Sequence, residues 1–131
     1  KAFYAAFAEG DAEAMMTLWH DDESVICIVP NLPYAQGYLS LMETWRTLFE
    51  IGRFKPLILA NHALDNSQTV VHNQLVHMEL TLNDNETMHH FNLHCTLVFT
   101  RTKDGWRISL FHASPAMDNN KLADEIPKLL H

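Results

Sequence analysis

Hydrophobic residues recur every three or four positions through most of the first 50 residues, which is the spacing of amphipathic helices. The first stripe ends at Gly10, and Asp11 can then accept the free amide hydrogens at the start of a second helix. The second stripe ends at the acidic residues 21–23. A short run rich in valine and isoleucine, residues 24–29, is typical of a strand buried on both sides, and Pro30 ends it.

A third hydrophobic stripe follows Ser40, which with Glu43 has the spacing of a capping box at a helix start. This helix is expected to end before Gly52, since glycine suits the left-handed position just past a helix. From Phe54 onward the period changes from 3.6 to 2, which is typical of strands. We expect strands over residues 57–63, 70–82, 87–102 and 106–114, with turns at 65–67, 83–85 and 103–105.

Helices followed by an antiparallel meander predict an α+β domain in which a curved sheet wraps the N-terminal helices and leaves a cone between them. The longest hairpin has its expected tip at Asp84 and Asn85, which sets its register. One face of this hairpin is the more apolar, and the other carries most of the polar side chains. The register predicts the cross-strand pairs Glu79 with His90, His77 with Asn92, and Leu75 with His94.

The chain has 131 residues, which fits one domain over 1–131, with 118–131 as a C-terminal extension. A formal net charge of −7 without a basic cluster argues against binding to nucleic acid or to anionic membranes. No apolar run is long enough to span a bilayer, so a soluble, cytoplasmic protein is expected. Cys27 and Cys95 lie in apolar strands without metal-site or disulfide spacing, and we expect two buried free thiols.

Four segments of the chain, in this order and spacing, resemble the SnoaL-like branch of the nuclear transport factor 2 (NTF2) superfamily. The closing segment is also similar to the end of the association domain of calcium/calmodulin-dependent kinase II. Related sequences often carry histidine where Val29 stands here, so this chain departs from the pattern at that position. The segments are Gly10-Asp11 to Trp19-His20-Asp21-Asp22, Ile26-Cys27-Ile28-Val29-Pro30, Gly37 to Trp45, and Gly105-Trp106-Arg107-Ile108 to Phe111-His112-Ala113-Ser114.

This resemblance implies a cone-shaped, cystatin-like fold and frequent dimerisation through the sheet. It also implies one of several functions, which include isomerases, cyclases, dehydratases, ligand binders and assembly domains. The function therefore has to be argued from the side chains that line the cone and cover the sheet.

The polar face of the long hairpin is the most unusual feature of the sequence. We expect it to be a dimer face or a wet outer face, with Glu79 and His90 as a cross-strand ion pair. A ligand pocket is the alternative if this face is the concave one. A metal site is not expected, because cross-strand neighbours about 5 Å apart do not converge on one point as zinc ligands must. The residues of this predicted face are His77, Glu79, His90, Asn92 and His94.

Two histidines are candidates for proton transfer, since imidazole titrates near neutral pH. His72 belongs to the apolar face of the hairpin, and His112 lies in the closing His-x-Ser element, in phase with Trp106 and Ile108. No nucleophile paired with a base is apparent. The side chains expected to reach a ligand, although a plain core position is the alternative for several of them, are Trp19, Tyr34, Trp45, Phe49, Gln74 and Phe91.

Three functions remain open. The first is a non-catalytic homodimer that binds a small, moderately hydrophobic molecule in the cone, without a cofactor. The second is an enzyme of SnoaL or ketosteroid-isomerase type that uses His72 or His112 as general acid-base. The third is an oligomerisation module like the kinase association domain.

Overall fold

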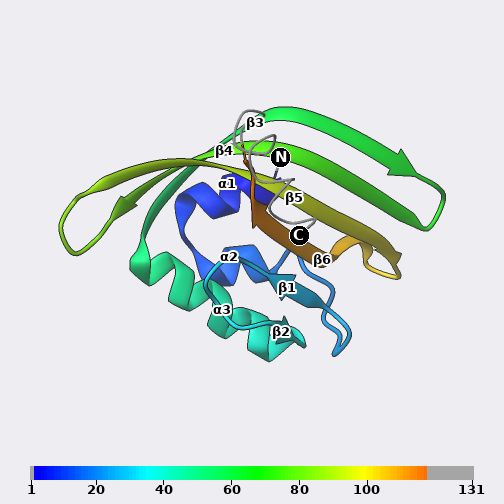
Figure 1. Cartoon of the computed structure of the whole chain (residues 1–131). Coiled ribbons are helices and arrows are strands. Elements are labelled where there is room, and N and C mark those ends of the chain that lie inside the picture. The colour runs from blue at the N-terminus through cyan, green and yellow to red at the C-terminus, as the bar shows by residue number, and fades with distance from the viewer. Residues whose placement is uncertain (1, 118–131) are drawn as a thin grey trace, which may run out of the picture.

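A computed structural model describes residues 2–117, in which a long, arched sheet lies over a layer of helices (Figure 1). The predicted C-terminal extension 118–131 lies outside the described residues. The helices are α1 (Ala2–Glu9), α2 (Ala12–Met16) and α3 (Tyr38–Ile51). The strands are β1 (Ile26–Ile28), β2 (Ala35–Gln36), β3 (Gly52–Asp65), β4 (Thr69–Leu82), β5 (Met88–Thr102) and β6 (Gly105–Pro115).

The sheet has the strand order β2-β1-β6-β5-β4-β3. Strands β3 to β6 form the predicted antiparallel meander, and the predicted α+β class with a curved sheet is confirmed. The sheet is mixed rather than purely antiparallel, because β1 pairs in parallel with β6. Strand β2 was not predicted, since two residues are too few to show a period.

The first two helices form as their patterns predict. Helix α1 buries Phe3 and Phe7 on one face, at the four-residue spacing of a helix side. The Asp11 carboxylate accepts hydrogen bonds from the backbone amides of Glu13 and Ala14, at 3.0 and 3.1 Å, which confirms the predicted cap of α2.

The start of α3 differs from its prediction. The helix begins at Tyr38, and the capping box of Ser40 and Glu43 does not form, because both residues already lie inside the helix. Gly37 precedes the helix with φ 97°, a conformation that favours glycine, and no side chain caps the helix. The Gly37 amide instead donates to the carbonyl of Val25 at 2.9 Å, so the preceding turn is held by the residue just before β1 rather than by a cap.

Gly52 has a different role from the predicted one. Its φ is 178°, which is extended backbone, so the chain passes from α3 directly into β3 instead of ending the helix in a left-handed residue. A Cβ at Gly52 would collide with the carbonyl oxygen of Thr81 on β4. Glycine is therefore required by the close approach of a neighbouring strand, which no local pattern in the sequence shows.

The predicted register of the β4–β5 hairpin is confirmed in all three named pairs, Glu79 with His90, His77 with Asn92, and Leu75 with His94. Its concave face is buried against the helices and its convex face is largely exposed. The buried residues of the concave face are Gln74, Val76, Met78, Leu93, Cys95 and Leu97.

Strand β6 contains an irregularity that changes which residues face the core. Val98 pairs with Leu110 while Phe99 pairs with Ile108, so Ser109 is an extra residue on β6. Ile108 and Phe111 are both buried as a result, although they are three positions apart. The predicted phase of β6, which placed Ile108 and His112 on one face, is therefore wrong.

Aromatic rings fill the space between the sheet and the helices. The ring centroids of Phe3 and Phe111 lie 4.7 Å apart, and those of Phe7 and Trp45 lie 5.3 Å apart in an edge-to-face arrangement. Both cysteines are free and buried, as predicted. Burial raises the pKa of Cys27 to about 12 and that of Cys95 to about 11, so both remain thiols at neutral pH.

We predict that Gly52→Ala destabilises the protein more than Gly10→Ala. At Gly10 an added Cβ meets only the Phe49 ring at 4.0 Å, so the positive φ of 71° is the main cost, about 1–2 kcal/mol. At Gly52 the collision is with backbone, which cannot rotate away, so we expect a loss of about 3 kcal/mol or more. Urea unfolding of both variants measures this difference, and equal losses would contradict the close approach of β4.

Candidate functional site

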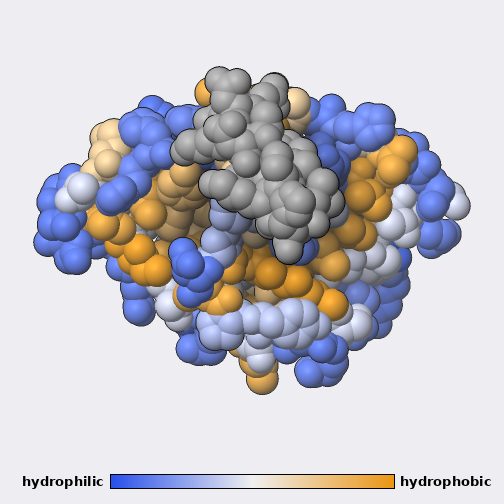
Figure 2. Space-filling model, in the orientation of Figure 1, coloured by the Kyte–Doolittle hydropathy of each residue, from blue (hydrophilic) through white to orange (hydrophobic). Residues whose placement is uncertain are grey.

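A cavity of about 420 Å³ lies between the concave face of the sheet, the end of α3 and the loop after β1. Figure 2 shows hydrophobic side chains gathered beneath the arch of the sheet, above the helices. The lining residues are Phe7, Val29, Pro30, Asn31, Leu32, Leu48, Ile51, Phe54, Met78, Leu80, Phe91, Leu93, Phe111, Ala113 and Pro115.

The period-2 pattern of the strands supplies much of this lining. Alternate residues of β4, β5 and β6 point into the cavity because side chains of a strand alternate between its two faces. Met78 and Leu80 come from β4, and Phe91 and Leu93 come from β5. The intervening residues of β4 and β5 lie on the convex face. The same two strands therefore build both the wall of the cavity and the outer surface.

The cavity offers very little polar chemistry. Of its 15 lining residues, 14 are apolar and Asn31 is the exception. Within the described part of the chain, no carboxylate, imidazole, amine or guanidinium lines it. A charged ligand inside would lose its hydration without gaining a partner of opposite charge, which is strongly unfavourable. The lining therefore suits an uncharged, mostly hydrophobic molecule.

Two buried tryptophan side chains, Trp19 and Trp45, lie behind the aromatic residues that line the cavity. Trp45 contacts the lining residues Phe7 and Phe111, with ring centroids 5.3 and 6.1 Å apart. Trp19 lies 6.4 Å from Trp45 by the same measure. Among the described residues, neither indole Nε1 has a hydrogen-bond acceptor. Both indoles act in the packing of the core, and neither lines the cavity.

A buried polar pair joins α1 to the sheet beside this core. The Tyr4 hydroxyl donates to the Gln74 side-chain oxygen at 2.6 Å. Burial raises the pKa of Tyr4, so the phenol stays protonated. Gln74 does not line the cavity, and its hydrogen bond satisfies a polar group that would otherwise be costly to bury.

The residues that we expected to contact a ligand are scattered over three environments. Phe91 lines the cavity. Trp19 and Trp45 are core, Gln74 is bonded to Tyr4, and half-buried Phe49 packs against Trp45. Tyr34 is 58% exposed, and its hydroxyl bonds to the Gln36 side chain at 3.2 Å.

Neither candidate catalytic histidine lines the cavity. His72 is half-buried further along β4, where its Nδ1 lies 3.1 Å from the Asn61 side-chain oxygen and its ring packs against Phe99. His112 is exposed on the convex face, because the extra residue Ser109 reverses the phase of the end of β6. The structure therefore places His112 outside the cone, so the expectation that it acts there is wrong. Any other catalytic role of His112 stays a prediction.

The five residues of the predicted polar face do lie together on the convex face. The His77 Nδ1 is 2.8 Å from the Asn92 side-chain oxygen, and the His77 Nε2 is 3.3 Å from the His90 Nδ1. The expected ion pair between Glu79 and His90 is not formed, because the His90 ring stacks on His77 instead. Within residues 2–117 no group of three metal-ligating side chains converges.

Several lining residues were missed by reasoning from the sequence. Leu48 and Ile51 come from the last turns of α3, and Phe54 follows at the start of β3. Residues 29–32 were interpreted only as the end of a strand and a loop. Their apolar character was visible in the sequence, but their convergence depends on how α3 crosses the sheet.

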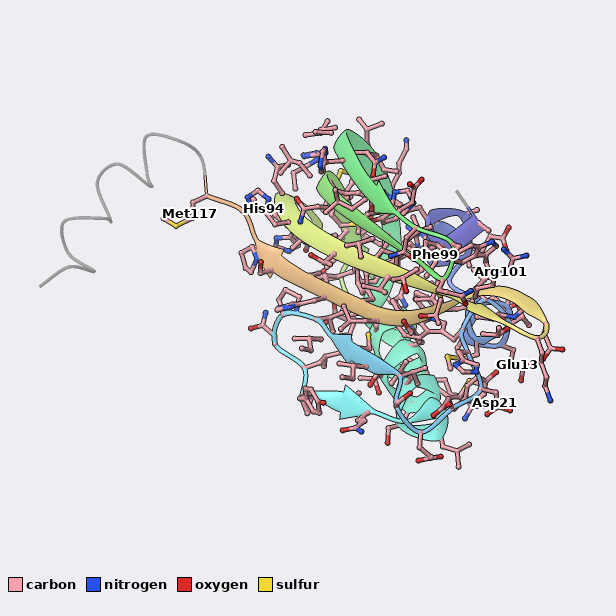
Figure 3. The ribbon with its side chains drawn as sticks, turned by 90° about the vertical axis from the view of Figure 1, so that its right-hand side faces the viewer. Glu13, Asp21, His94, Phe99, Arg101 and Met117 are labelled. Carbon is pink, nitrogen blue, oxygen red and sulfur yellow. The ribbon has the colours of Figure 1, made fainter. Side chains whose placement is uncertain are left out.

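A second hollow lies at the other end of the sheet and has a mixed polar lining. It contains two acidic and two basic side chains, so no net charge attracts an ion of either sign. Its residues are His20, Asp21, Arg101, Thr102, Lys103 and Asp104. Figure 3 shows Asp21 and Arg101 at this end, far along β5 from His94.

No helix among residues 2–117 is long and apolar enough to pass through a lipid bilayer. No curated protein is found to match the chain in sequence.

Solved structures show the same fold. A candidate dehydratase of the NTF2-like family from Streptomyces avermitilis is 22% identical, with a TM-score of 0.80 and coverage of 88% of this chain and 90% of that one. An NTF2-like superfamily protein from Salmonella enterica is 16% identical, with a TM-score of 0.82 over 90% and 86%.

A higher identity is found with one further structure, described as a candidate calcium/calmodulin-dependent protein kinase type II association domain from Thiobacillus denitrificans. It is 34% identical, with a TM-score of 0.73 and coverage of 88% of this chain and 90% of that one. The family model of the SnoaL-like domain matches residues 1–118. The chain therefore belongs to the SnoaL-like domain family.

Proposed function

We propose that this protein binds a small, uncharged and largely hydrophobic molecule in its cone, without catalysing a reaction. The observation that carries the proposal is the lining of the cavity, in which Asn31 supplies the only polar side chain among the described residues. A cavity of about 420 Å³ lies within the range of small-molecule sites in proteins.

The same lining argues against acid-base catalysis at this site. A general acid or base has to lie within hydrogen-bond reach of the proton that it moves, and no titratable side chain of residues 2–117 lines the cavity. Val29, which stands where related sequences often carry histidine, is one of the lining residues. His72 is held by Asn61 outside the cavity. The dehydratase chemistry named for one structural neighbour therefore does not extend to this chain in our proposal.

We also propose that the protein forms a homodimer through the convex face of its sheet. This face combines exposed apolar side chains with neutral polar ones, which is the usual mixture of an interface between subunits. Leu57 is 60% exposed and pairs with His77, so it lies on this face, part-way along the edge strand β3. A second copy would cover the exposed apolar side chains of this face, such as Leu57 and Leu64.

We predict that the cavity prefers a neutral ligand to an otherwise matched anion. N-phenyl-1-naphthylamine and its 8-sulfonate derivative share one aromatic body and differ by one charge. The neutral probe should bind at least about tenfold more tightly, because the sulfonate would be desolvated without a partner. Fluorescence titration with direct excitation of the probe measures both affinities, and equal or reversed affinities would contradict an uncharged site.

A matched pair of variants tests whether the neutral probe binds in the cavity. Leu80 lines the cavity, whereas the next residue, Thr81, faces the convex side. Leu80→Trp should weaken binding of the neutral probe at least about tenfold by filling the cavity, and Thr81→Trp should leave it unchanged. Circular dichroism checks that both variants fold. Unchanged binding by folded Leu80→Trp would place the probe elsewhere.

We predict that Leu57→Glu dissociates the dimer. Burying an unpaired carboxylate between two copies should raise the dissociation constant at least about tenfold. Leu39→Glu is the control, since Leu39 is 78% exposed on α3, away from the sheet. Sedimentation velocity at micromolar concentration measures both. A wild-type monomer, or a Leu57→Glu variant as dimeric as the control, would contradict the proposed interface.

A further inference from the structure

Five of the nine histidines of the chain lie on the convex face of the sheet. His62 and His112 belong to one cross-strand row, through Asn73 and Thr96, and the others follow in neighbouring rows. Residues paired in this way share a face, since cross-strand partners point to the same side. The five are His62 on β3, His77 on β4, His90 and His94 on β5, and His112 on β6.

Two of these rings are held in a hydrogen-bonded chain that suits their neutral form. As the Asn92 side-chain oxygen can only accept, His77 donates its Nδ1 hydrogen to it, at 2.8 Å. A neutral His77 then accepts at Nε2, and His90 donates from Nδ1 over 3.3 Å. Protonating both rings would break this second hydrogen bond and place two cations with ring centroids 5.4 Å apart.

The fixed charges around the histidines nearly cancel. Arg53 and Lys55 lie at one end of the face and Arg107 at the other, against Glu79 and Glu86. These three positive and two negative side chains give the face a net charge of +1 while its histidines are neutral, although the whole chain has a formal net charge of −7. Adding five protons would raise the charge of the face to +6.

The groups facing the paired rings would not offset this gain. Across β4 and β5, His90 lies opposite Glu79, and His77 lies opposite uncharged Asn92. On β3, Leu57 faces His77 and Lys55 faces Glu79, so the one carboxylate beside the rings already has a cationic neighbour. Among residues 2–117, the two carboxylates of this face, Glu79 and Glu86, are therefore too few to neutralise the charge that protonation adds.

We infer that protonation of this histidine face controls the association of two copies, with the dimer favoured above neutral pH and dissociated by mild acid. This inference rests on the proposed dimerisation through the same face. Imidazole side chains ordinarily titrate near pH 6.5, so the change falls between pH 8 and 5.5. The separated copies take up the protons more readily than the dimer, and linkage then requires acid to shift the equilibrium toward monomer.

Sedimentation velocity of the full chain at pH 8.0, 7.0, 6.0 and 5.5, at constant ionic strength, tests the inference. The dissociation constant should rise at least about tenfold from pH 8.0 to 5.5, which corresponds to the net uptake of less than one proton over that range. Circular dichroism at pH 5.5 checks the fold. Binding of neutral N-phenyl-1-naphthylamine should not change with pH, because none of the described residues that line the cavity is titratable.

The double variant His77→Gln/His90→Gln removes the two bonded rings and keeps neutral polar side chains. It should dimerise at pH 8.0 and lose at least half of the logarithmic pH dependence. His89→Gln is the matched control, since His89 is adjacent in sequence to His90 but lies on the concave side. It should keep the full dependence. If the double variant fails to dimerise at pH 8.0, His94→Gln/His112→Gln takes its place with the same expectation.

The outcomes separate the two proposals. A dimer whose dissociation constant is flat with pH overturns proton control and leaves the interface standing. A monomer at every pH overturns both. A pH dependence that neither double variant reduces places the responsible groups elsewhere and overturns the role of the histidine face.

Discussion

The pairing of β4 with β5 is the constraint on which the rest of this protein depends. Because side chains alternate along both strands, one register places one set of residues against the helices and the other set on the convex surface. If β4 kept its place, a slip of β5 by one residue would move Leu93 to the surface and bring Asn92 into the core. The large difference in polarity between the two sets makes the observed register strongly preferred.

This division also separates the two proposed activities. The concave side closes an apolar cavity, and the convex side carries five histidines. Neighbouring residues such as Leu80 and Thr81 therefore belong to different surfaces. Ligand binding and association are expected to respond to different conditions, although the same two strands build both.

Proteins with this fold carry different functions because the fold fixes the shape of the cone and leaves its lining free to vary. In this chain the lining is nearly all hydrocarbon and aromatic, and its buried polar groups lie outside it. Tyr4 and Gln74 satisfy each other beside the core, and His72 is held by Asn61. The proposed function follows from this placement rather than from the fold.

The sequence by itself determined the elements that depend on local order: the helical stripes, the Asp11 cap and the register of the hairpin at Asp84-Asn85. Periodicity and turn residues carry that information, because they concern neighbours along the chain. Only the tertiary structure decided which apolar residues enclose the cavity, why Gly52 lies against β4, and where Ser109 turns His112 outward. These depend on contacts between distant segments, which no local pattern of hydrophobic and polar residues records.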